Sequence, residues 1–225
     1  MLQLTRDASA YQHRDSLTKA YPDAVSHEPF IASTPARSLK YGPHDSIFLE
    51  GDQAGHIYEM VEGAVMLYKL LPDGRRQVVE LLVPGDLFGL TCDEFQDCSA
   101  EALTVVRVRI HTREAVERSA ELQQRLFCHA RAQMQALRDH AVLLGRKSAM
   151  ERVASFIERL ALSSDDDAIR LPMTRQEIAD YLGLTIETVS RSFSELRRRG
   201  LVACERQDVI RVPDLERISE LTGAH

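Results

Sequence analysis

Residues 174–200 decide the fold of this chain, and they read TRQEIADYLGLTIETVSRSFSELRRRG. The pattern predicts two helices joined by a tight turn. Thr174 stands where an N-cap belongs and Glu177 follows three residues later, which makes a capping box. Gly183 interrupts the helical pattern where the chain has to turn sharply. Thr185 can then cap the second helix, so the stretch is expected to fold as two short crossing helices.

The first helix is expected over about residues 175–182 and the second over about 186–199, and the second carries an exposed polar face. Residues three and four apart are neighbours on a helix, so Glu187, Ser190 and Arg191 share that face. Arginine can hold guanine O6 and N7 with two hydrogen bonds, a carboxylate accepts from cytosine N4, and serine suits several partners. We therefore predict a DNA-binding helix-turn-helix in which these three side chains read bases. The alternative is a helical hairpin with an exposed Glu187–Arg191 pair, which contributes about 0.2–0.5 kcal/mol.

A second set of side chains around this face is expected to contact the DNA backbone. Arginines at the end of the second helix suit phosphate contact, although positive charge there also offsets the helix dipole. Arg206 is expected at the tip of a wing, where it either touches phosphate or lies in a solvated turn. The predicted backbone contacts are Thr174, Arg175, Thr185, Thr188, Arg197 and Arg206.

The run E-T-V-S-R at residues 187–191 resembles the Crp/Fnr superfamily of bacterial transcription regulators. The recognition helix of the Fnr and FixK branch carries Glu-x-x-Ser-Arg, as this chain does. The catabolite-activator branch has Arg before that Glu and Gly in place of the Ser, whereas this chain has Ile186 and Ser190. The resemblance covers most of the chain beyond about residue 35 and is closest to the FixK-type branch.

This resemblance implies a homodimeric, sequence-specific activator that binds a TTGA-like inverted repeat in double-stranded DNA and contacts RNA polymerase. FixK-type members often control genes of microoxic respiration or nitrogen fixation. The resemblance also implies an α+β fold with a cyclic-nucleotide-binding-type β-roll (a jelly roll), a long dimerisation helix and a winged helix-turn-helix. The expected parts are a mobile arm over 1–34, the roll over 35–110, the dimerisation helix over 111–145 and the DNA-binding part over 146–225.

Composition agrees with this reading. The chain has 225 residues, enough for two modest domains, and is 44% hydrophobic and 28% charged. Its formal net charge of -6 argues against nonspecific coating of nucleic acid but leaves room for a local reading surface. No signal peptide or long apolar run is apparent, and the four cysteines are irregularly spaced, so a cytoplasmic protein with reduced thiols and no membrane partner is expected.

Short apolar segments punctuated by glycines predict the strands of the roll. The segments EGDQAGHIYEMVEGAV and PGDLFGL resemble the cyclic-nucleotide-binding type of roll. The expected strands are residues 46–49, 57–61, 64–71, 76–83 and 101–110.

The nucleotide-binding cassette of that family is altered in this chain. The cassette has a Glu for the ribose and an Arg for the cyclic phosphate, and Leu90 and Cys98 stand in those places. A buried phosphate without a cation is costly, so cyclic nucleotide binding is not expected. Residues 1–34 hold no cysteine for the iron–sulfur centre of oxygen-sensing Fnr proteins. His44, His56 and His111 are scattered, so neither a cofactor nor a metal is expected.

Apolar and small residues at alternating spacings of three and four predict one long helix over about residues 112–145, with a dimer seam. The stripe consists of Val116, Ala120, Gln123, Phe127, Ala130, Met134, Leu137, Ala141 and Leu144. Its strongest members are expected to be Val116, Phe127, Met134, Leu137 and Leu144. The alternative is a helix that packs only on its own domain. Dimerisation would let two recognition helices enter successive major grooves about 34 Å apart.

Cys204 is a candidate redox residue, since it lies in the predicted wing near Arg206, where oxidation would impair DNA contact. Cys92 and Cys98 lie in an acidic loop, and nearby negative charge slows thiol oxidation. Two other functions stay open: a regulator gated by a small effector in the roll, and a non-DNA β-roll sensor or enzyme. No nucleophile elbow, P-loop or zinc-ligand pattern supports catalysis.

Overall fold

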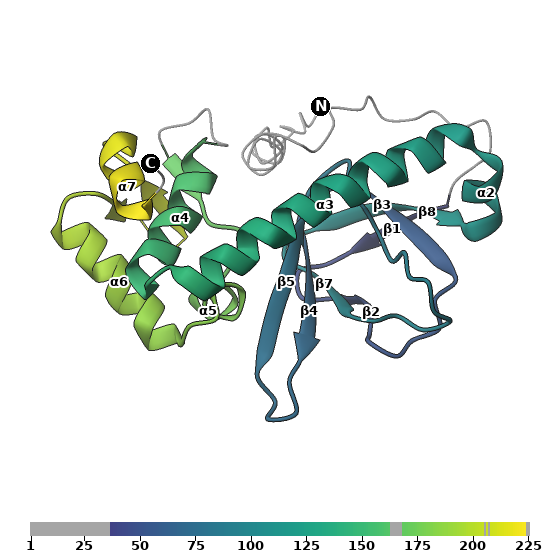
Figure 1. Ribbon diagram of the computed structural model, residues 1–225, viewed down its shortest axis with the longest axis horizontal. Coiled ribbons are helices and arrows are strands. Elements are labelled where there is room, and N and C mark those ends of the chain that lie inside the picture. Colours follow the sequence, from purple (N-terminus) through teal and green to yellow (C-terminus); the bar gives the residue numbers. More distant parts are fainter. Residues whose placement is uncertain (1–36, 163–167, 205, 207, 224–225) are drawn as a thin grey trace, which may run out of the picture.

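The computed structural model describes residues 37–162, 168–204, 206 and 208–223. A β-roll and a C-terminal helical unit are joined by one long helix, α3 (Figure 1). The predicted arm over residues 1–34 lies outside the described residues. None of the described helices is long and apolar enough to cross a membrane. The residue bounds of the predicted parts stay predictions.

The roll consists of two four-stranded antiparallel sheets, in the orders β1-β8-β3-β6 and β2-β7-β4-β5. Their alternating side chains enclose a common apolar core. The roll of the predicted α+β fold is therefore confirmed. Its strands are β1 (Arg37–Tyr41), β2 (Ser46–Phe48), β3 (His56–Glu62), β4 (Val65–Leu70), β5 (Arg76–Leu82), β6 (Leu87–Phe88), β7 (Ser99–Ala102) and β8 (Val106–Thr112).

The single strand predicted over residues 101–110 is wrong, because β7 and β8 lie in different sheets and the chain crosses between them. Gly63 packs against the backbone of this crossing. A Cβ at Gly63 would lie 2.3 Å from the carbonyl oxygen of Val105, and the φ of Gly63 is +90°. Only glycine fits such a close approach with this backbone conformation.

The long helix is also divided. It forms α2 (Arg113–Arg118) and α3 (Ala120–Arg146), separated by Ser119, which has extended backbone and accepts a hydrogen bond from the N–H of Leu122. Ser119 thus acts as the N-cap of α3. Val116 is 7% exposed and packs with Ile57 and Leu122 against the roll. The placement of Val116 in a dimer seam is therefore wrong, because the break turns its side chain into the protomer's own core.

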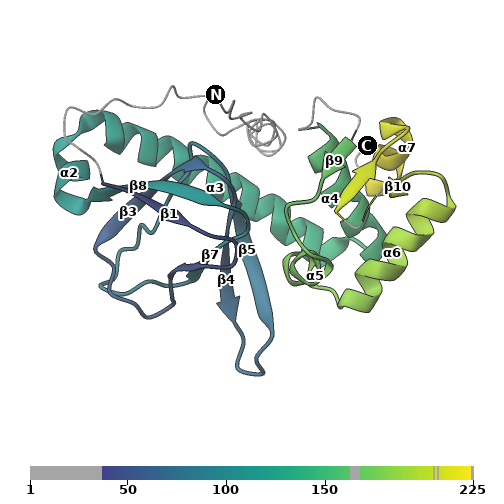
Figure 2. The same ribbon diagram turned by 180° about the vertical axis from the view of Figure 1, so that it is seen from behind.

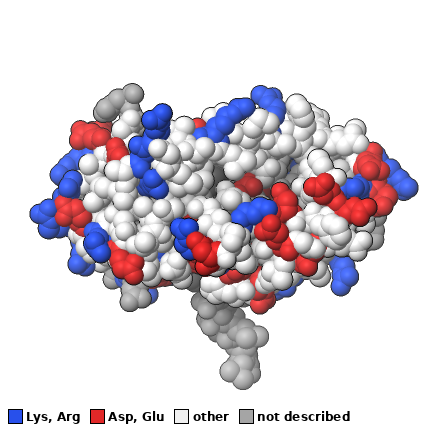
Figure 3. Space-filling model, turned by 60° about the horizontal axis from the view of Figure 1, so that its bottom comes forward, with Lys and Arg blue, Asp and Glu red and all other residues white. Residues whose placement is uncertain are grey.

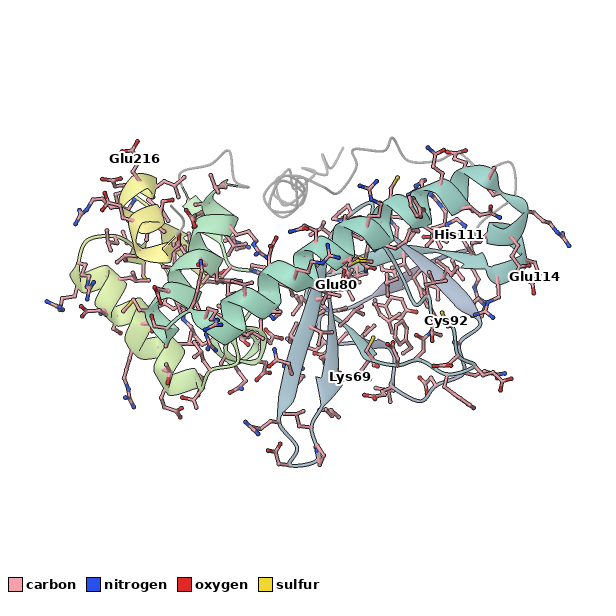
Figure 4. The ribbon with its side chains drawn as sticks, in the orientation of Figure 1. Lys69, Glu80, Cys92, His111, Glu114 and Glu216 are labelled. Carbon is pink, nitrogen blue, oxygen red and sulfur yellow. The ribbon has the colours of Figure 1, made fainter. Side chains whose placement is uncertain are left out.

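Buried charged groups hold α3 on the roll. Glu59 of β3 accepts from Arg125 of α3 at 2.8 Å and from Arg109 at 2.9 Å, and it contacts the His111 ring at 2.9 Å. Burial alone would raise the pKa of Glu59, but the hydrogen bonds of His111 and Arg125 outweigh it and lower that pKa to about 2. Figure 4 shows His111 beside α3, with Glu80 where β5 meets the same helix.

Glu80 is expected to make stability depend on pH. Burial, with a smaller contribution from Asp86, raises the pKa of Glu80 from 4.5 to about 7, against the lowering effect of its hydrogen bond with Gln133. The folded state then binds this proton more tightly than the unfolded state, so stability is lost as the pH rises from about 4.5 to 7. Glu80→Gln removes the charge and should stabilise the protein by about 1–3 kcal/mol at pH 8, with little effect at pH 4. Urea unfolding at both pH values measures this.

The matched control is Glu117→Gln, an exposed glutamate of α2, which should change stability little at either pH. If Glu80→Gln changed the free energy of unfolding equally at pH 4 and pH 8, the raised pKa of the buried Glu80 carboxyl would be wrong.

The C-terminal unit is a winged helix-turn-helix, as predicted (Figure 2). A three-stranded sheet of order β10-β11-β9 packs with four helices around a core that includes Ile157, Ile178, Leu182, Leu196 and Ile210. Its elements are α4 (Ala149–Leu162), β9 (Ala168–Arg170), α5 (Arg175–Leu182), α6 (Ile186–Arg198), β10 (Ala203–Cys204), β11 (Val209–Arg211) and α7 (Leu215–Thr222).

The connection between α3 and α4, called the hinge below, consists of Lys147 and Ser148. Gly145 is inside α3, and the chain leaves helical geometry at Lys147. Arg152 of α4 fixes this hinge, because its guanidinium donates to the carbonyl oxygens of Leu144 at 2.6 Å, Lys147 at 2.9 Å and Leu182 at 3.0 Å. One side chain thereby caps the carboxyl ends of both α3 and α5.

Candidate DNA-binding surface

Local signals set the angle between α5 and α6. Thr174 caps α5: its Oγ1 accepts from the N–H of Glu177, and its own N–H donates to the Glu177 carboxylate at 2.6 Å. Gly183 ends α5 in the left-handed conformation with φ of 61°. Thr185 then caps α6 by accepting from the N–H of Thr188. The predicted capping box and both caps are confirmed.

One face of α6 is buried and the other is exposed. Val189, Phe193 and Leu196 pack into the core. The three predicted base-reading residues, Glu187, Ser190 and Arg191, are all exposed. Figures 1 and 2 show α6 on the outer side of the unit, with α5 between α6 and the roll. The structure therefore brings these three side chains together on one exposed face of α6.

The Glu187–Arg191 helix pair considered as the alternative does not form a direct contact. The N–H of Glu187 and the Thr185 hydroxyl lower the pKa of Glu187, and the charge of Arg191 adds a smaller effect. Within the part of the chain that the structure describes, the guanidinium groups of Arg191 and Arg197 make no ion pair or hydrogen bond. Both are available to a DNA ligand.

The remaining arginines at the end of α6 are already paired. Glu195 accepts from Arg198 at 2.7 and 2.8 Å and from Arg199 at 2.7 Å. These hydrogen bonds lower the pKa of Glu195 to about 2. Of the predicted arginine cluster, Arg197 is thus the member best placed for phosphate. The pairing follows the three- and four-residue spacing of a helix and could have been found from the sequence.

Arg175 has a structural contact that the sequence did not indicate. Its guanidinium carbon lies 3.4 Å from the centre of the Phe193 ring, and the residue is half-buried. This cation–π contact ties the start of α5 to α6. Thr174 and Thr185 are exposed but engaged in capping, and Thr188 is half-buried. Their backbone contacts with DNA stay predictions.

The wing brings Cys204 near the same contact. Cys204 is half-buried in β10. Burial lowers the pKa of the Arg175 guanidinium, and Cys204 opposes this with a smaller effect. Arg206 is exposed, and its N–H donates to the carbonyl oxygen of Val209. Cys204 thus lies in β10, and Arg206 lies between β10 and β11, where the sequence predicted the turn of the wing.

Charge on the surface is mixed. Figure 3 shows Lys and Arg interspersed with Asp and Glu on the face in view, in line with the net charge of -6. Attraction to DNA must then come from a few placed arginines rather than from a broad basic field.

The outer side of α3 carries an exposed apolar stripe. Phe127 is 65% exposed, Met134 51% and Leu137 49%. Leu144 is half-buried and packs on the C-terminal core. Val142 is also exposed but does not follow the heptad spacing of the stripe. Large apolar side chains in a row on one protomer are typical of a surface that is covered by a partner.

An aromatic cluster lies in the core of the roll. Phe48, Tyr58 and Phe88 fill its interior, and the rings of Tyr58 and Phe88 stack with centres 5.1 Å apart. Cys98 stands where the family cassette has its phosphate-binding Arg. Burial, assisted by Asp97, raises the pKa of the Cys98 thiol to about 12. A neutral thiol cannot balance a buried phosphate.

The comparisons with known proteins agree with this geometry. A family model described as Crp-like helix-turn-helix domain matches residues 151–221, and one described as cyclic nucleotide-binding domain matches 38–121. The chain is 43% identical to the nitrogen fixation regulation protein FixK of Bradyrhizobium diazoefficiens over 176 residues, 74% of each chain.

Two further relatives extend the match. The transcriptional activatory protein AadR of Rhodopseudomonas palustris is 39% identical over 209 residues, which are 89% of this chain and 86% of AadR. The solved structure of FixK2 from Bradyrhizobium japonicum is 36% identical, with a TM-score of 0.79 over 85% of this chain and all of that chain. These relatives are named as regulators and activators, not as enzymes.

Proposed function

Because the chain belongs to the FixK and Fnr-type transcription regulators of the Crp/Fnr family, we propose that it acts as a homodimeric activator on a TTGA-like inverted repeat. The observation that carries the proposal is the exposed face of α6, on which Glu187, Ser190 and Arg191 lie together. Among the residues that the structure describes, the guanidinium of Arg191 has no hydrogen-bond or ion-pair partner. In this proposal Arg191 holds the guanine of the half-site and Glu187 accepts a hydrogen bond from cytosine. Ser190 makes a further hydrogen bond to a base edge. Thr174, Arg175, Thr185, Thr188, Arg197 and Arg206 contact the DNA backbone.

The dimer would form along the outer stripe of α3. Phe127, Met134 and Leu137 expose apolar surface at coiled-coil spacing. Pairing of two copies about a two-fold axis relates their α6 helices by the same symmetry, which a palindromic site matches. Dimerisation along the stripe would therefore place two α6 helices in the two-fold arrangement that an inverted repeat requires.

The wider role of this activator follows from its relatives. Three of the relatives are named for the regulation of nitrogen fixation, so we propose target genes of nitrogen fixation or microoxic respiration. Activation requires contact with RNA polymerase, and action on chromosomal DNA implies the cytoplasm. Leu90 and Cys98 stand where the nucleotide-binding cassette has its Glu and Arg, so we propose that DNA binding needs no cyclic nucleotide.

A titration of fluorescent TTGA-N6-TCAA duplex with purified protein tests this function. The proposal expects binding without any added ligand and no change with cyclic AMP. Binding that appears only with an added effector would instead establish the ligand-gated regulator. An absence of binding to any duplex would leave the non-DNA sensor.

Oxidation of Cys204 is expected to weaken DNA binding. A sulfinic or sulfonic group in β10 adds negative charge beside Arg175 and the wing, close to the phosphates. Peroxide treatment should therefore reduce affinity for the duplex by about 3- to 10-fold, and Cys204→Ser should abolish the effect. Anisotropy titrations before and after oxidation measure it, with Cys92→Ser as the matched control. A loss of affinity that persists in Cys204→Ser would assign the sensitivity to another residue.

A further inference from the structure

The roll and the helix-turn-helix meet directly, apart from their link through α3. Arg76 of β5 donates to Asp180 of α5 at 2.9 Å, and the Gln77 side chain donates to the carbonyl oxygen of Tyr181 at 3.3 Å. Arg76 also donates to Glu101 of β7 at 3.2 Å. We call this set of residues the roll–α5 contact. It holds the first helix of the DNA-binding motif against the edge of the roll.

Three metal-ligating side chains converge at this contact. The Nδ1 atom of His44 lies 3.2 Å from Oε1 of Glu101 and 3.6 Å from Oε1 of Glu177. All three ligand atoms lie within 4.8 Å of one another. His44 comes from the turn between β1 and β2, Glu101 from β7 and Glu177 from α5. The chain thus gathers them from both parts of the protein.

The spacing suits a tetrahedral metal. Zinc bonds of about 2.0–2.2 Å at tetrahedral angles separate ligand atoms by roughly 3.3–3.6 Å. Of the two distances from the His44 nitrogen, 3.6 Å lies at the upper end of this range and 3.2 Å lies just below it. The mixture of one imidazole and two carboxylates is a ligand set that zinc and its neighbours accept, whereas calcium and magnesium favour oxygen alone.

Both carboxylates are already oriented. Glu177 is 3% exposed, and its Oε2 accepts from the N–H and the hydroxyl of Thr174, which leaves Oε1 turned toward His44. Glu101 uses Oε2 for Arg76 and likewise presents Oε1 to His44. Hydrogen bonds to the far oxygen of a ligating carboxylate are the usual way in which proteins hold a metal ligand. The exposed His44 leaves one side open for a water ligand and for entry of the ion.

The charges at the roll–α5 contact leave room for a cation. Glu101 of the roll lies opposite Glu177 and Asp180 of α5 in this contact. The guanidinium of Arg76 pairs with Glu101 and with Asp180. With His44 neutral, these groups retain two negative charges, which a divalent ion balances.

We propose that His44, Glu101 and Glu177 bind a divalent transition-metal ion of the zinc class, with water as the fourth ligand. The ion would bridge the roll and the helix-turn-helix through the residue that closes the capping box of α5. Occupancy would then stabilise the docked position of the DNA-binding unit by an amount that grows with the logarithm of the metal concentration above the dissociation constant. Sequence spacing did not indicate this site, because its ligands are separated by 57 and 76 residues along the chain.

Cobalt and zinc binding to the full-length chain test the site. Metal-free protein is titrated with Co²⁺, followed by visible absorption, and with Zn²⁺ in equilibrium dialysis. We expect one ion per protomer, tetrahedral cobalt bands and dissociation constants below about 10 µM. His44→Ala and Glu101→Gln should each weaken binding at least about 10-fold, as loss of a ligand requires.

The control is His56→Ala, an exposed histidine elsewhere on the roll, which should leave affinity unchanged. Far-ultraviolet circular dichroism checks that each variant is folded. An absence of binding below about 10 µM in the wild type, or binding that survives both His44→Ala and Glu101→Gln, would overturn the proposal. Because the readout is metal rather than DNA, failure here leaves the proposed regulator function untouched.

Discussion

Arg191→Ala is expected to weaken binding to the TTGA-N6-TCAA duplex by about 5- to 150-fold, the equivalent of about 1–3 kcal/mol. Arg191 is exposed on α6 and makes no ion pair or hydrogen bond within the described part of the chain, so it is free to hold guanine O6 and N7. Its removal should also reduce the preference for guanine at that position. Competition titrations with single-base variants of the duplex measure both effects.

Two arginines near Arg191 on α6 serve as matched controls. Arg197→Ala should weaken binding to all duplexes by the same factor and reduce the salt dependence of the affinity, because Arg197 is assigned to a phosphate contact. Arg198→Ala should change affinity less, since that guanidinium is paired with Glu195. If Arg191→Ala kept the full preference for guanine, the assignment of base reading to this residue would be wrong.

The second large effect is expected from charges on the α3 stripe. Replacing Phe127 and Met134 together with Glu puts like charges where two copies of α3 would pack. The doubly substituted protein should be a monomer. It should bind the inverted repeat at least about 100-fold more weakly, because each protomer then binds its half-site without a second protomer linked to it. Sedimentation equilibrium measures the mass and anisotropy measures the affinity.

Gln135→Glu is the control for this pair, since Gln135 is exposed on α3 but lies off the stripe. It should remain a dimer with full affinity. The stability of the protomer should change little in the double variant, because Phe127 and Met134 are exposed within it. A double variant that stayed dimeric would contradict the placement of the interface.

The sequence predicted those features whose causes are local. The capping box of Thr174 and Glu177, the left-handed Gly183 and the Thr185 cap are short-range signals, and each was found where expected. The predicted strand over 101–110 was wrong because sheet membership depends on distant partners. Val116 fitted the heptad spacing, yet the Ser119 cap divided the helix and turned this residue inward.

Contacts between distant segments could not be read from the sequence. The hydrogen bonds of Glu59 with Arg125 and of Arg76 with Asp180 join residues 66 and 104 positions apart. No periodicity marks such pairs, because each depends on how the roll packs against helices that follow it. The cluster of His44, Glu101 and Glu177 escaped notice for the same reason.

Binding to duplexes with altered spacing tests the central claim, that the protein reads an inverted repeat as a symmetric pair. The half-sites of TTGA-N6-TCAA lie about one helical turn apart, and about five added base pairs would move one of them to the opposite side of the DNA. The account predicts two protomers per original duplex and a loss of affinity of at least about 100-fold for the lengthened one. Equal affinity for both duplexes, with one protomer bound to each half-site independently, would contradict it.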